Sequence, residues 1–200
     1  MPDYLPAFLD LRERQCLVVG GGEIGERKAR ELLACQASLT VVSPCLTRGL
    51  QALAESRAIA WRPRTFLRSD VRRCTLVIAA TGVPAVDERV AAEARRRGVL
   101  VNVVDRPGQC DFIFGSILRR GELQIAVSTG GRSPALAREI RRGLESVFGP
   151  EYAELVEQVG QERRRARESA PTPEARLAVG ERVVALALSG ARPFVRGGRE

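Results

Sequence analysis

Short apolar runs alternate with amphipathic stretches over the first hundred residues of the chain. Residues 17–19 and 75–80 are the strongest apolar runs, and turn-forming residues bound both, as expected for buried strands. Between the runs, apolar side chains recur at helical spacing, as at Leu46, Leu50 and Leu53. The expected order is strand 17–19, helix 26–33, strand 39–42, helix 46–56, strand 59–62, strand 75–80, helix 84–97 and strand 100–104. This alternation predicts an α/β fold with a Rossmann-type parallel, doubly wound sheet.

The periodicity changes after residue 111. Two strand-like runs, 112–118 and 123–127, are separated by the polar turn 119–122. Ser133-Pro134 then supplies a helix N-cap and a proline at the first helical position. The expected helices are 134–148, 151–168 and 174–188, with a break at 170–173 and a frayed tail at 191–200. We therefore divide the chain into a nucleotide-binding domain (1–111), a dimerisation segment (112–149) and a helical domain with its tail (150–200).

A glycine-rich turn follows the first apolar run directly. It reads Gly20-x-Gly22-x-x-Gly25 and leads into the helical stretch 26–33. In the order strand, turn, helix, the first glycine permits the tight turn, the second lets backbone approach a pyrophosphate, and the third lets helix pack on strand. Free N–H groups at the helix start then face the phosphates. The motif predicts that the chain binds a dinucleotide.

Composition describes a globular protein of 200 residues, 44% of them hydrophobic, which is enough for one domain and a small appendage. No apolar run approaches the roughly 20 residues of a membrane helix, and the start MPDYLPAFLD lacks the pattern of a signal peptide. We expect a soluble, cytoplasmic protein without a membrane partner.

The net charge is +8, and because Lys28 is the only lysine, arginine supplies nearly all of the positive charge. A polyanionic partner is one interpretation, and a compositional preference for arginine on the surface is the other. No nucleic-acid-binding motif accompanies the charge, so no nucleic-acid partner is expected. The five cysteines form no CxxC pair and the chain has no histidine, so no resident metal site is expected.

Four segments should meet at the carboxyl edge of the sheet, where such folds bind ligands. They are the glycine turn, Ser43-Pro44-Cys45, the segment 80–82 with Thr81, and the segment 102–105 with Asn102, Val103 and Asp105. Ser43 stands where many such domains keep an acid for the ribose. Arg48 follows a few residues later, so the choice between NAD and NADP stays open at this point.

Asp105 is the candidate catalytic residue. A carboxylate at a strand end, partly shielded by apolar neighbours, can act as a general base in a chain without histidine. On position alone, an aspartate capping a turn before Arg106-Pro107 is the simpler interpretation. A second candidate site is a nest for substrate carboxylates, formed by Ser128, Thr129, Gly130, Gly131 and Arg132, for which a plain strand-to-helix turn is the alternative. Cys110 is expected to be a structural thiol.

With these pieces in order, the chain resembles the precorrin-2 dehydrogenase/sirohydrochlorin ferrochelatase family, the amino-terminal module of siroheme synthase. The resemblance extends over about 140 residues and lies in segments that keep the family's order and spacing. These segments are 4–8, 11–12, 18–29, 39–42, 79–81, 101–105, 112–113, 116–117, 126–131 and 133–138.

The resemblance implies a homodimer that oxidises precorrin-2 to sirohydrochlorin with NAD⁺, and in many members inserts Fe²⁺ as a second substrate to give siroheme. It places Glu23 and Ile24 at the nucleotide and the 43–45 turn near the adenosine. It also makes Asp105 the catalytic aspartate of both reactions. The substrate's carboxylates give Arg106, Arg119, Arg120 and Arg132 a partner. Thr129 matches a serine that is phosphorylated in some members.

Two alternatives accompany this interpretation. In the first, the protein is only a dehydrogenase, and a separate chelatase inserts the iron. In the second, it is a regulatory nucleotide-sensing domain without catalysis. The 200 residues do not include the methyltransferase half of the trifunctional enzymes, and we expect precorrin-2 to come from another protein.

Overall fold

The computed structural model describes residues 4–169 and 172–190, so the proposed frayed tail at 191–200 and part of the break at 170–173 lie outside the described residues. The chain divides into two compact units between Ile113 and Phe114. Each unit is described by itself below. The separate helical domain at 150–200 remains a prediction.

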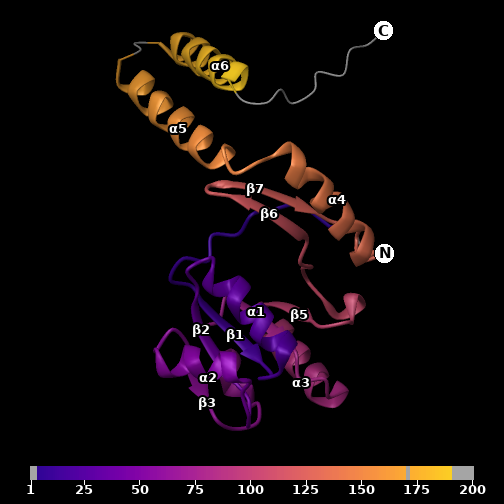
Figure 1. Cartoon of the computed structure of the whole chain (residues 1–200). Coiled ribbons are helices and arrows are strands. Elements are labelled where there is room, and N and C mark those ends of the chain that lie inside the picture. Colours follow the sequence, from indigo (N-terminus) through magenta and orange to yellow (C-terminus); the bar gives the residue numbers. More distant parts are fainter. Residues whose placement is uncertain (1–3, 170–171, 191–200) are drawn as a thin grey trace. The chain divides into compact units, whose positions relative to one another are not determined.

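The first unit is a five-stranded parallel sheet in the order β3-β2-β1-β4-β5 (Figure 1). The strands are β1 (Gln15–Val19), β2 (Ser38–Val42), β3 (Ala60–Arg62), β4 (Leu76–Ala79) and β5 (Leu100–Val103). Their connections contain helices α1 (Glu23–Leu33), α2 (Arg48–Glu55) and α3 (Pro84–Arg96), and the short 3₁₀ turns η1 (Arg68–Val71) and η2 (Pro107–Gln109). The reversal of strand order beside β1 marks the switch point of a Rossmann-type sheet.

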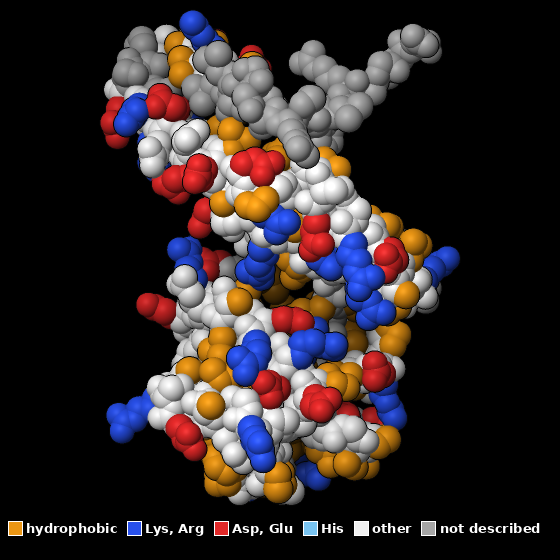
Figure 2. Space-filling model, viewed as in Figure 1, with side chains coloured by type: hydrophobic (Ala, Val, Ile, Leu, Met, Phe, Trp, Pro, Cys, Tyr) orange, Lys and Arg blue, Asp and Glu red, His pale blue; other side chains and the backbone are white. Residues whose placement is uncertain are grey.

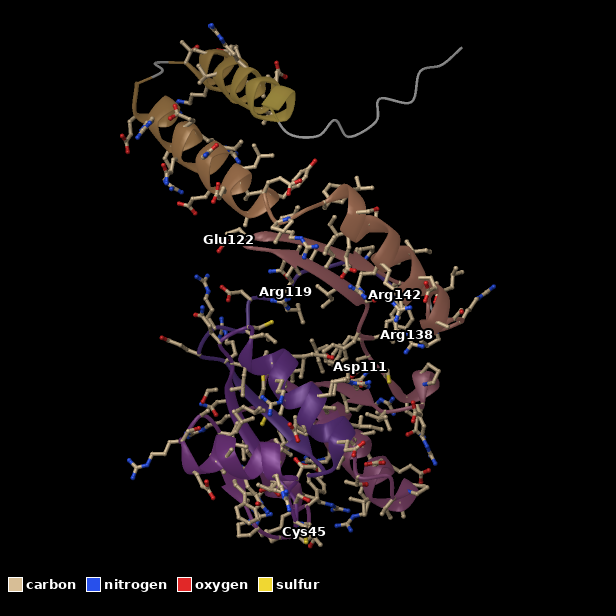
Figure 3. The ribbon with its side chains drawn as sticks, in the orientation of Figure 1. Cys45, Asp111, Arg119, Glu122, Arg138 and Arg142 are labelled. Carbon is tan, nitrogen blue, oxygen red and sulfur yellow. The ribbon has the colours of Figure 1, made fainter. Side chains whose placement is uncertain are left out.

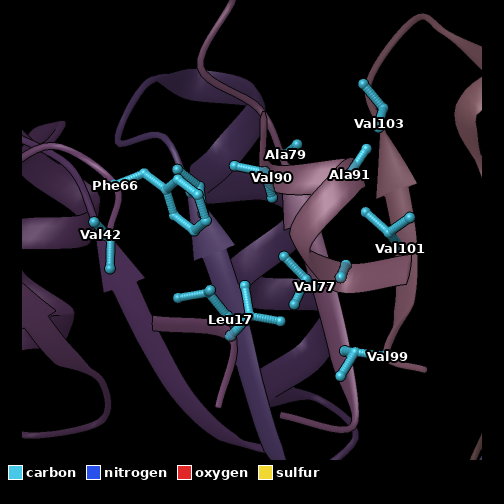
Figure 4. Close-up of a cluster of buried hydrophobic side chains, with 13 residues drawn as sticks. Leu17, Val42, Phe66, Val77, Ala79, Val90, Ala91, Val99, Val101 and Val103 are labelled. Atoms are coloured by element: carbon cyan, nitrogen blue, oxygen red, sulfur yellow. The ribbon is translucent and has the colours of Figure 1, made fainter. Parts of the chain in front are cut away.

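Alternating side chains place helices on both faces of this sheet. Leu17 and Val19 of β1 belong to a buried cluster with Val90 of α3 (Figure 4). Val18, between them in sequence, faces α1, where a Cβ added to Gly25 would lie 3.7 Å from Val18 Cγ1. Because successive strand residues point to opposite faces, an apolar run of this kind is buried on both sides. The doubly wound sheet expected from the sequence is confirmed.

The second unit joins an antiparallel hairpin to three helices. Strands β6 (Ser116–Arg120) and β7 (Leu123–Val127) pair across a tight turn in which Gly121 has φ 55°. The helices are α4 (Pro134–Val147), which packs on the hairpin, α5 (Tyr152–Ser169) and α6 (Pro173–Gly190). Ser133 Oγ accepts a hydrogen bond from Leu136 N, so Ser133 is the N-cap of α4 as predicted.

Two predicted boundaries were wrong. The first helix begins at Glu23, not residue 26, because Gly22 is its N-cap and Gly25 lies inside its first turn. The first strand of the hairpin begins at Ser116, not residue 112, and it includes Arg119 and Arg120, which were expected in the turn. Asn102 Nδ2 donates to the carbonyl of Phe112 at 2.9 Å, so the segment after residue 111 first packs along β5.

Candidate active site

The predicted ligand-binding segments meet at the carboxyl edge of the first unit's sheet. Hydrogen bonds continue the pairing one residue beyond each strand, so that the turns leave the sheet side by side. The bonds run from Gly20 N to Val42 O (3.0 Å), Ser43 N to Arg62 O (3.3 Å), Ala80 N to Val19 O (2.8 Å) and Val104 N to Ala79 O (3.0 Å). This edge therefore brings the glycine turn, the 43–45 turn, Thr81 and the Asp105 segment together.

The three glycines of the motif have three different environments. Gly20 has φ 121°, and a Cβ added there would lie 2.2 Å from Ala80 O. A Cβ on Gly25 would lie 2.3 Å from Gly20 O, which is the close helix–strand approach. No atom lies within 4 Å of a Cβ built on Gly22, so the space beside this residue is open. Only Gly22 thus leaves room for a bound group.

The start of α1 fits a pyrophosphate. Gly22 is its N-cap and has no side chain to bond the exposed N–H groups, and the first helical bond is Glu26 N to Gly22 O at 2.9 Å. The N–H groups of the first turn therefore lack partners within the helix and attract an anion. Glu23 and Ile24 are exposed on this turn, as their predicted place at the nucleotide requires.

The loop after β2 is tied to the glycine turn. Thr47 N donates to Gly21 O at 2.9 Å, and Thr47 Oγ1 donates to Glu26 Oε2 at 2.5 Å. The bonds from Thr47 and Arg30 hold the pKa of the Glu26 carboxyl below its usual range. Ser43 is buried, and its carbonyl accepts from Trp61 Nε1 at 3.0 Å.

Pro44 and Cys45 are exposed at the tip of this loop. Cys45 is labelled in Figure 3. Their predicted place near the adenosine remains a prediction, which their exposure permits.

The turn after β4 is fixed by a buried acid. Asp87 Oδ1 accepts from Thr81 N at 3.2 Å and from Thr81 Oγ1 at 2.7 Å, and Asp87 is 6% exposed. Val83 N donates back to Thr81 Oγ1 at 3.1 Å. The Thr81 side chain is thus held in place at the edge where the nicotinamide end of a dinucleotide is predicted.

Asp105 follows β5 in a left-handed conformation, with φ 58°, and is exposed. Within the part of the chain that the structure describes, its carboxylate has no hydrogen bond or ion pair. We expected apolar neighbours to shield the Asp105 carboxylate in part. That expectation is wrong for a single copy of the chain, because Asp105 lies in an exposed left-handed turn. An exposed, unpaired carboxylate is free to meet a large substrate.

The neighbours of Asp105 in β5 are less accessible than predicted. Val103 is 1% exposed and belongs to the hydrophobic core. Asn102 is 8% exposed, and its amide donates to Phe112 O. Their assigned contacts, with cofactor for Val103 and with substrate for Asn102, remain predictions. Cys110, which was expected to be a structural thiol, is half-buried and accepts a hydrogen bond from Val103 N, and burial raises its pKa.

The second unit carries the proposed carboxylate nest. Gly130 and Gly131 have φ 63° and 82°, and Gly130 N donates to Ser128 Oγ at 3.1 Å. Thr129 Oγ1 accepts from Ser133 N at 3.0 Å and lies 3.1 Å from Ser133 O, so its hydroxyl is engaged within the turn. Arg132 is exposed. The turn is built as a strand-to-helix connection, and its binding of substrate remains a prediction.

One buried polar cluster was missed by the sequence reasoning. The Asp70 side chain is fully buried and lies 2.6 Å from both Arg62 Nη1 and Arg64 Nη2. It also accepts from Leu67 N at 2.8 Å. Burial raises the pKa of the Asp70 carboxyl, but these bonds outweigh burial and hold the pKa below its usual range. The only feature of the sequence that points to this cluster is an acidic residue inside an arginine-rich loop.

The arginine excess forms no single patch on the visible face. Lys and Arg side chains lie among Asp and Glu side chains there (Figure 2). Several are paired within one helix, as Arg96 and Arg97 are with the buried Glu93. These pairs favour the compositional interpretation of the charge.

Two family models match the chain. The model described as "Putative NAD(P)-binding" covers residues 7–116, which is more than half of the chain. The chain belongs to this NAD(P)-binding family. The second model, "Sirohaem biosynthesis protein central", covers residues 120–146. Family membership supports the expected NAD-binding domain, and the contacts assigned to the glycine turn remain predictions.

Curated relatives extend the match over most of the chain. The siroheme synthase of Methylococcus capsulatus is 42% identical over 182 residues, which are 91% of this chain and 38% of that protein. The siroheme synthase of Nitrosomonas europaea is 44% identical over 167 residues, 83% of this chain and 35% of that protein. The resemblance stated from the sequence is thus confirmed, and the chain spans less than two fifths of the length of these relatives.

Among solved structures, "SirC, precorrin-2 dehydrogenase" matches with a TM-score of 0.71 at 21% identity, over 93% of this chain and all of that chain. At this identity the match supports the fold, and it confirms the expected architecture. Among the described residues, no helix has the length and apolar character needed to span a membrane. The same residues contain no group of three His, Cys, Asp or Glu side chains placed to hold a metal ion.

Proposed function

We propose that the protein oxidises precorrin-2 to sirohydrochlorin with NAD⁺. The observation that carries the proposal is the shared sheet edge: a glycine turn with open space beside Gly22 stands on the same edge as the unpaired carboxylate of Asp105. The similarity to siroheme synthases over 91% of the chain supports the substrate class.

The chain's residues fit the cofactor. The glycine turn and the N–H groups of α1 hold the pyrophosphate, residues 43–45 line the adenosine side, and Thr81 lies toward the nicotinamide. When bound, NAD⁺ supplies a hydride acceptor. Val103 supports this side from the hydrophobic core, where its side chain is buried.

Asp105 acts as the general base. Oxidation of precorrin-2 removes two electrons and two protons from the macrocycle; one proton leaves with the electron pair as hydride, and the Asp105 carboxylate takes the other and passes it to solvent. The 128–132 turn, with Arg132, binds the carboxylates of the substrate. Asn102 supports the substrate side from β5.

Iron insertion is the second proposed step. Fe²⁺ enters sirohydrochlorin as two pyrrole protons leave, and Asp105 accepts these protons. We also propose that the protein works as a homodimer in the cytoplasm. All five cysteines are free, which is consistent with a reducing compartment.

The test is NADH formation from NAD⁺ and enzymatically generated precorrin-2 under anaerobic conditions, with NADP⁺ in parallel. Substrate-dependent NADH is expected, and adding Fe²⁺ to purified sirohydrochlorin is expected to yield siroheme. Nucleotide binding without turnover would overturn the dehydrogenase and favour a nucleotide-sensing domain. Turnover without siroheme would leave a dehydrogenase that depends on a separate chelatase.

A further inference from the structure

Strand β5 lies at the edge of the sheet and pairs only with β4, so the peptide groups on its outer side need other partners. The returning chain provides them. Asp111 N donates to Val101 O at 2.8 Å, and Val101 N donates to Asp111 Oδ2 at 3.0 Å. Asp111 is labelled in Figure 3. Its side chain thus completes a pairing that a further strand would otherwise make.

The thiol of Cys110 makes the second contact that closes the returning loop onto the outer side of β5. Val103 N donates to Cys110 Sγ at 3.2 Å, and Sγ lies 3.2 Å from Val103 O and 3.3 Å from Arg106 O. The thiol therefore contacts the residues on both sides of the 104–105 turn. Because burial raises its pKa, it stays protonated at neutral pH and can donate to one of these carbonyls.

Between these contacts the loop that carries Asp105 has few other ties. Val104 N donates to Ala79 O at 3.0 Å, Arg106 N donates to Val103 O at 3.2 Å, and the other backbone bonds belong to the short turn η2. Arg106 Nη1 also donates to Glu88 Oε1 at 2.8 Å, which ties one side of the loop to α3. A left-handed residue without side-chain partners keeps its position only if the flanking segments are fixed. The thiol of Cys110 is the side-chain group that fixes both flanks of Asp105.

We propose that Cys110 is a positioning residue for Asp105: its thiol closes the loop on β5 and so sets the direction of the catalytic carboxylate. This inference rests on the proposed function only where it treats Asp105 as catalytic. The contact between the Cys110 thiol and β5 does not depend on that function. The sulfur does not contact substrate or take part in proton transfer.

The test compares Cys110→Ala, Cys110→Ser and Cys74→Ala in the full chain. Cys74 is a matched control, because it is also half-buried, packs on the same hydrophobic cluster, and has a thiol near a backbone carbonyl, Asp70 O at 3.4 Å. All three variants remove similar apolar contacts, but only Cys110 contacts the Asp105 loop.

Cys110→Ala is expected to lower kcat for precorrin-2 oxidation by about tenfold, with NAD⁺ affinity unchanged, because the misplaced carboxylate meets the substrate poorly. Cys110→Ser retains a donor and an acceptor and should restore kcat to within about threefold of wild type. Hydrogen exchange at residues 104–109 should be faster in Cys110→Ala alone.

These measurements distinguish failure of the proposed function from failure of the positioning role of Cys110. A wild-type protein that does not oxidise precorrin-2 overturns the proposed function, while the exchange measurement still decides the closure. Equal exchange at 104–109 in Cys110→Ala and Cys74→Ala, or equal kcat in both, overturns the role of Cys110.

Discussion

The carbonyl oxygen of Gly20 lies 2.3 Å from the position that a Cβ atom would take on Gly25. The two glycines are five residues apart, and the contact joins the end of β1 to the first turn of α1. Gly22, between them, has no such neighbour. The motif therefore separates packing from binding, and the two functions can be removed independently.

Gly25→Ala is expected to destabilise the fold. The new methyl group would collide with the Gly20 backbone, which cannot move without disturbing the turn, so we expect a loss of about 1–3 kcal/mol in the free energy of unfolding. Urea denaturation followed by circular dichroism measures it. A midpoint equal to wild type would show that α1 can shift away from β1 at little cost.

Gly22→Ala is expected to leave the stability nearly unchanged and to weaken nucleotide binding. Gly22 has φ −81° and ψ −176°, which any residue adopts, and its side is open, so stability should stay within about 0.5 kcal/mol of wild type. The methyl group would occupy the approach to the pyrophosphate, and the affinity for NAD⁺ should fall by about tenfold or more. Calorimetric titration measures the affinity. An unchanged Kd contradicts a pyrophosphate at this turn.

Asp105→Asn isolates the carboxylate charge. Asparagine tolerates the left-handed conformation that Asp105 adopts, whereas alanine would add backbone strain. We expect NADH formation to fall by about 100-fold or more, with the melting temperature and NAD⁺ affinity unchanged. Asp105→Ala should show the same loss with some destabilisation. Undiminished turnover in both variants removes Asp105 from the mechanism.

Asp70→Asn should reveal a pH-dependent contribution to stability. The folded-state pKa of Asp70 lies below its ordinary value of 3.8, so the charged form stabilises the fold above that pH and the contribution is lost as pH falls through the folded pKa. At pH 7 the variant should lose about 2 kcal/mol, the typical cost of hydrogen bonds to a charged group. The difference in urea midpoint between wild type and variant should be full at pH 7 and should shrink as the pH falls below about 4 and through the folded-state pKa. A constant difference would assign the effect to packing.

The sheet was predictable because its central strands, β1 and β4, are buried on both faces. The runs around Leu17 and Ile78 are apolar, and the run around Val101 is apolar except for Asn102, which is the pattern of a parallel central sheet and leaves little ambiguity. The tight turn at Gly20 and the close approach at Gly25 were also predictable, since both follow from the order strand, turn, helix. The start of α1 was missed by three residues because a glycine-rich first turn has no helical signature.

The arrangement around Asp105 depends on contacts that sequence spacing does not encode. A cysteine thiol bonded to a strand edge looks, in sequence, like any small buried residue. The same holds for Asp70, whose arginine partners are six and eight residues away across a loop of irregular backbone. In both cases the tertiary structure, not local propensity, selects the partner.

Trp61 is the only tryptophan of the chain, and its indole donates to the carbonyl of Ser43 on the loop expected to face the adenosine. The side chain is 39% exposed. Tryptophan fluorescence from this protein therefore originates at a single position beside the nucleotide edge of the sheet. Its emission overlaps the absorption of reduced nicotinamide, so energy transfer from Trp61 would report bound NADH in real time without a label.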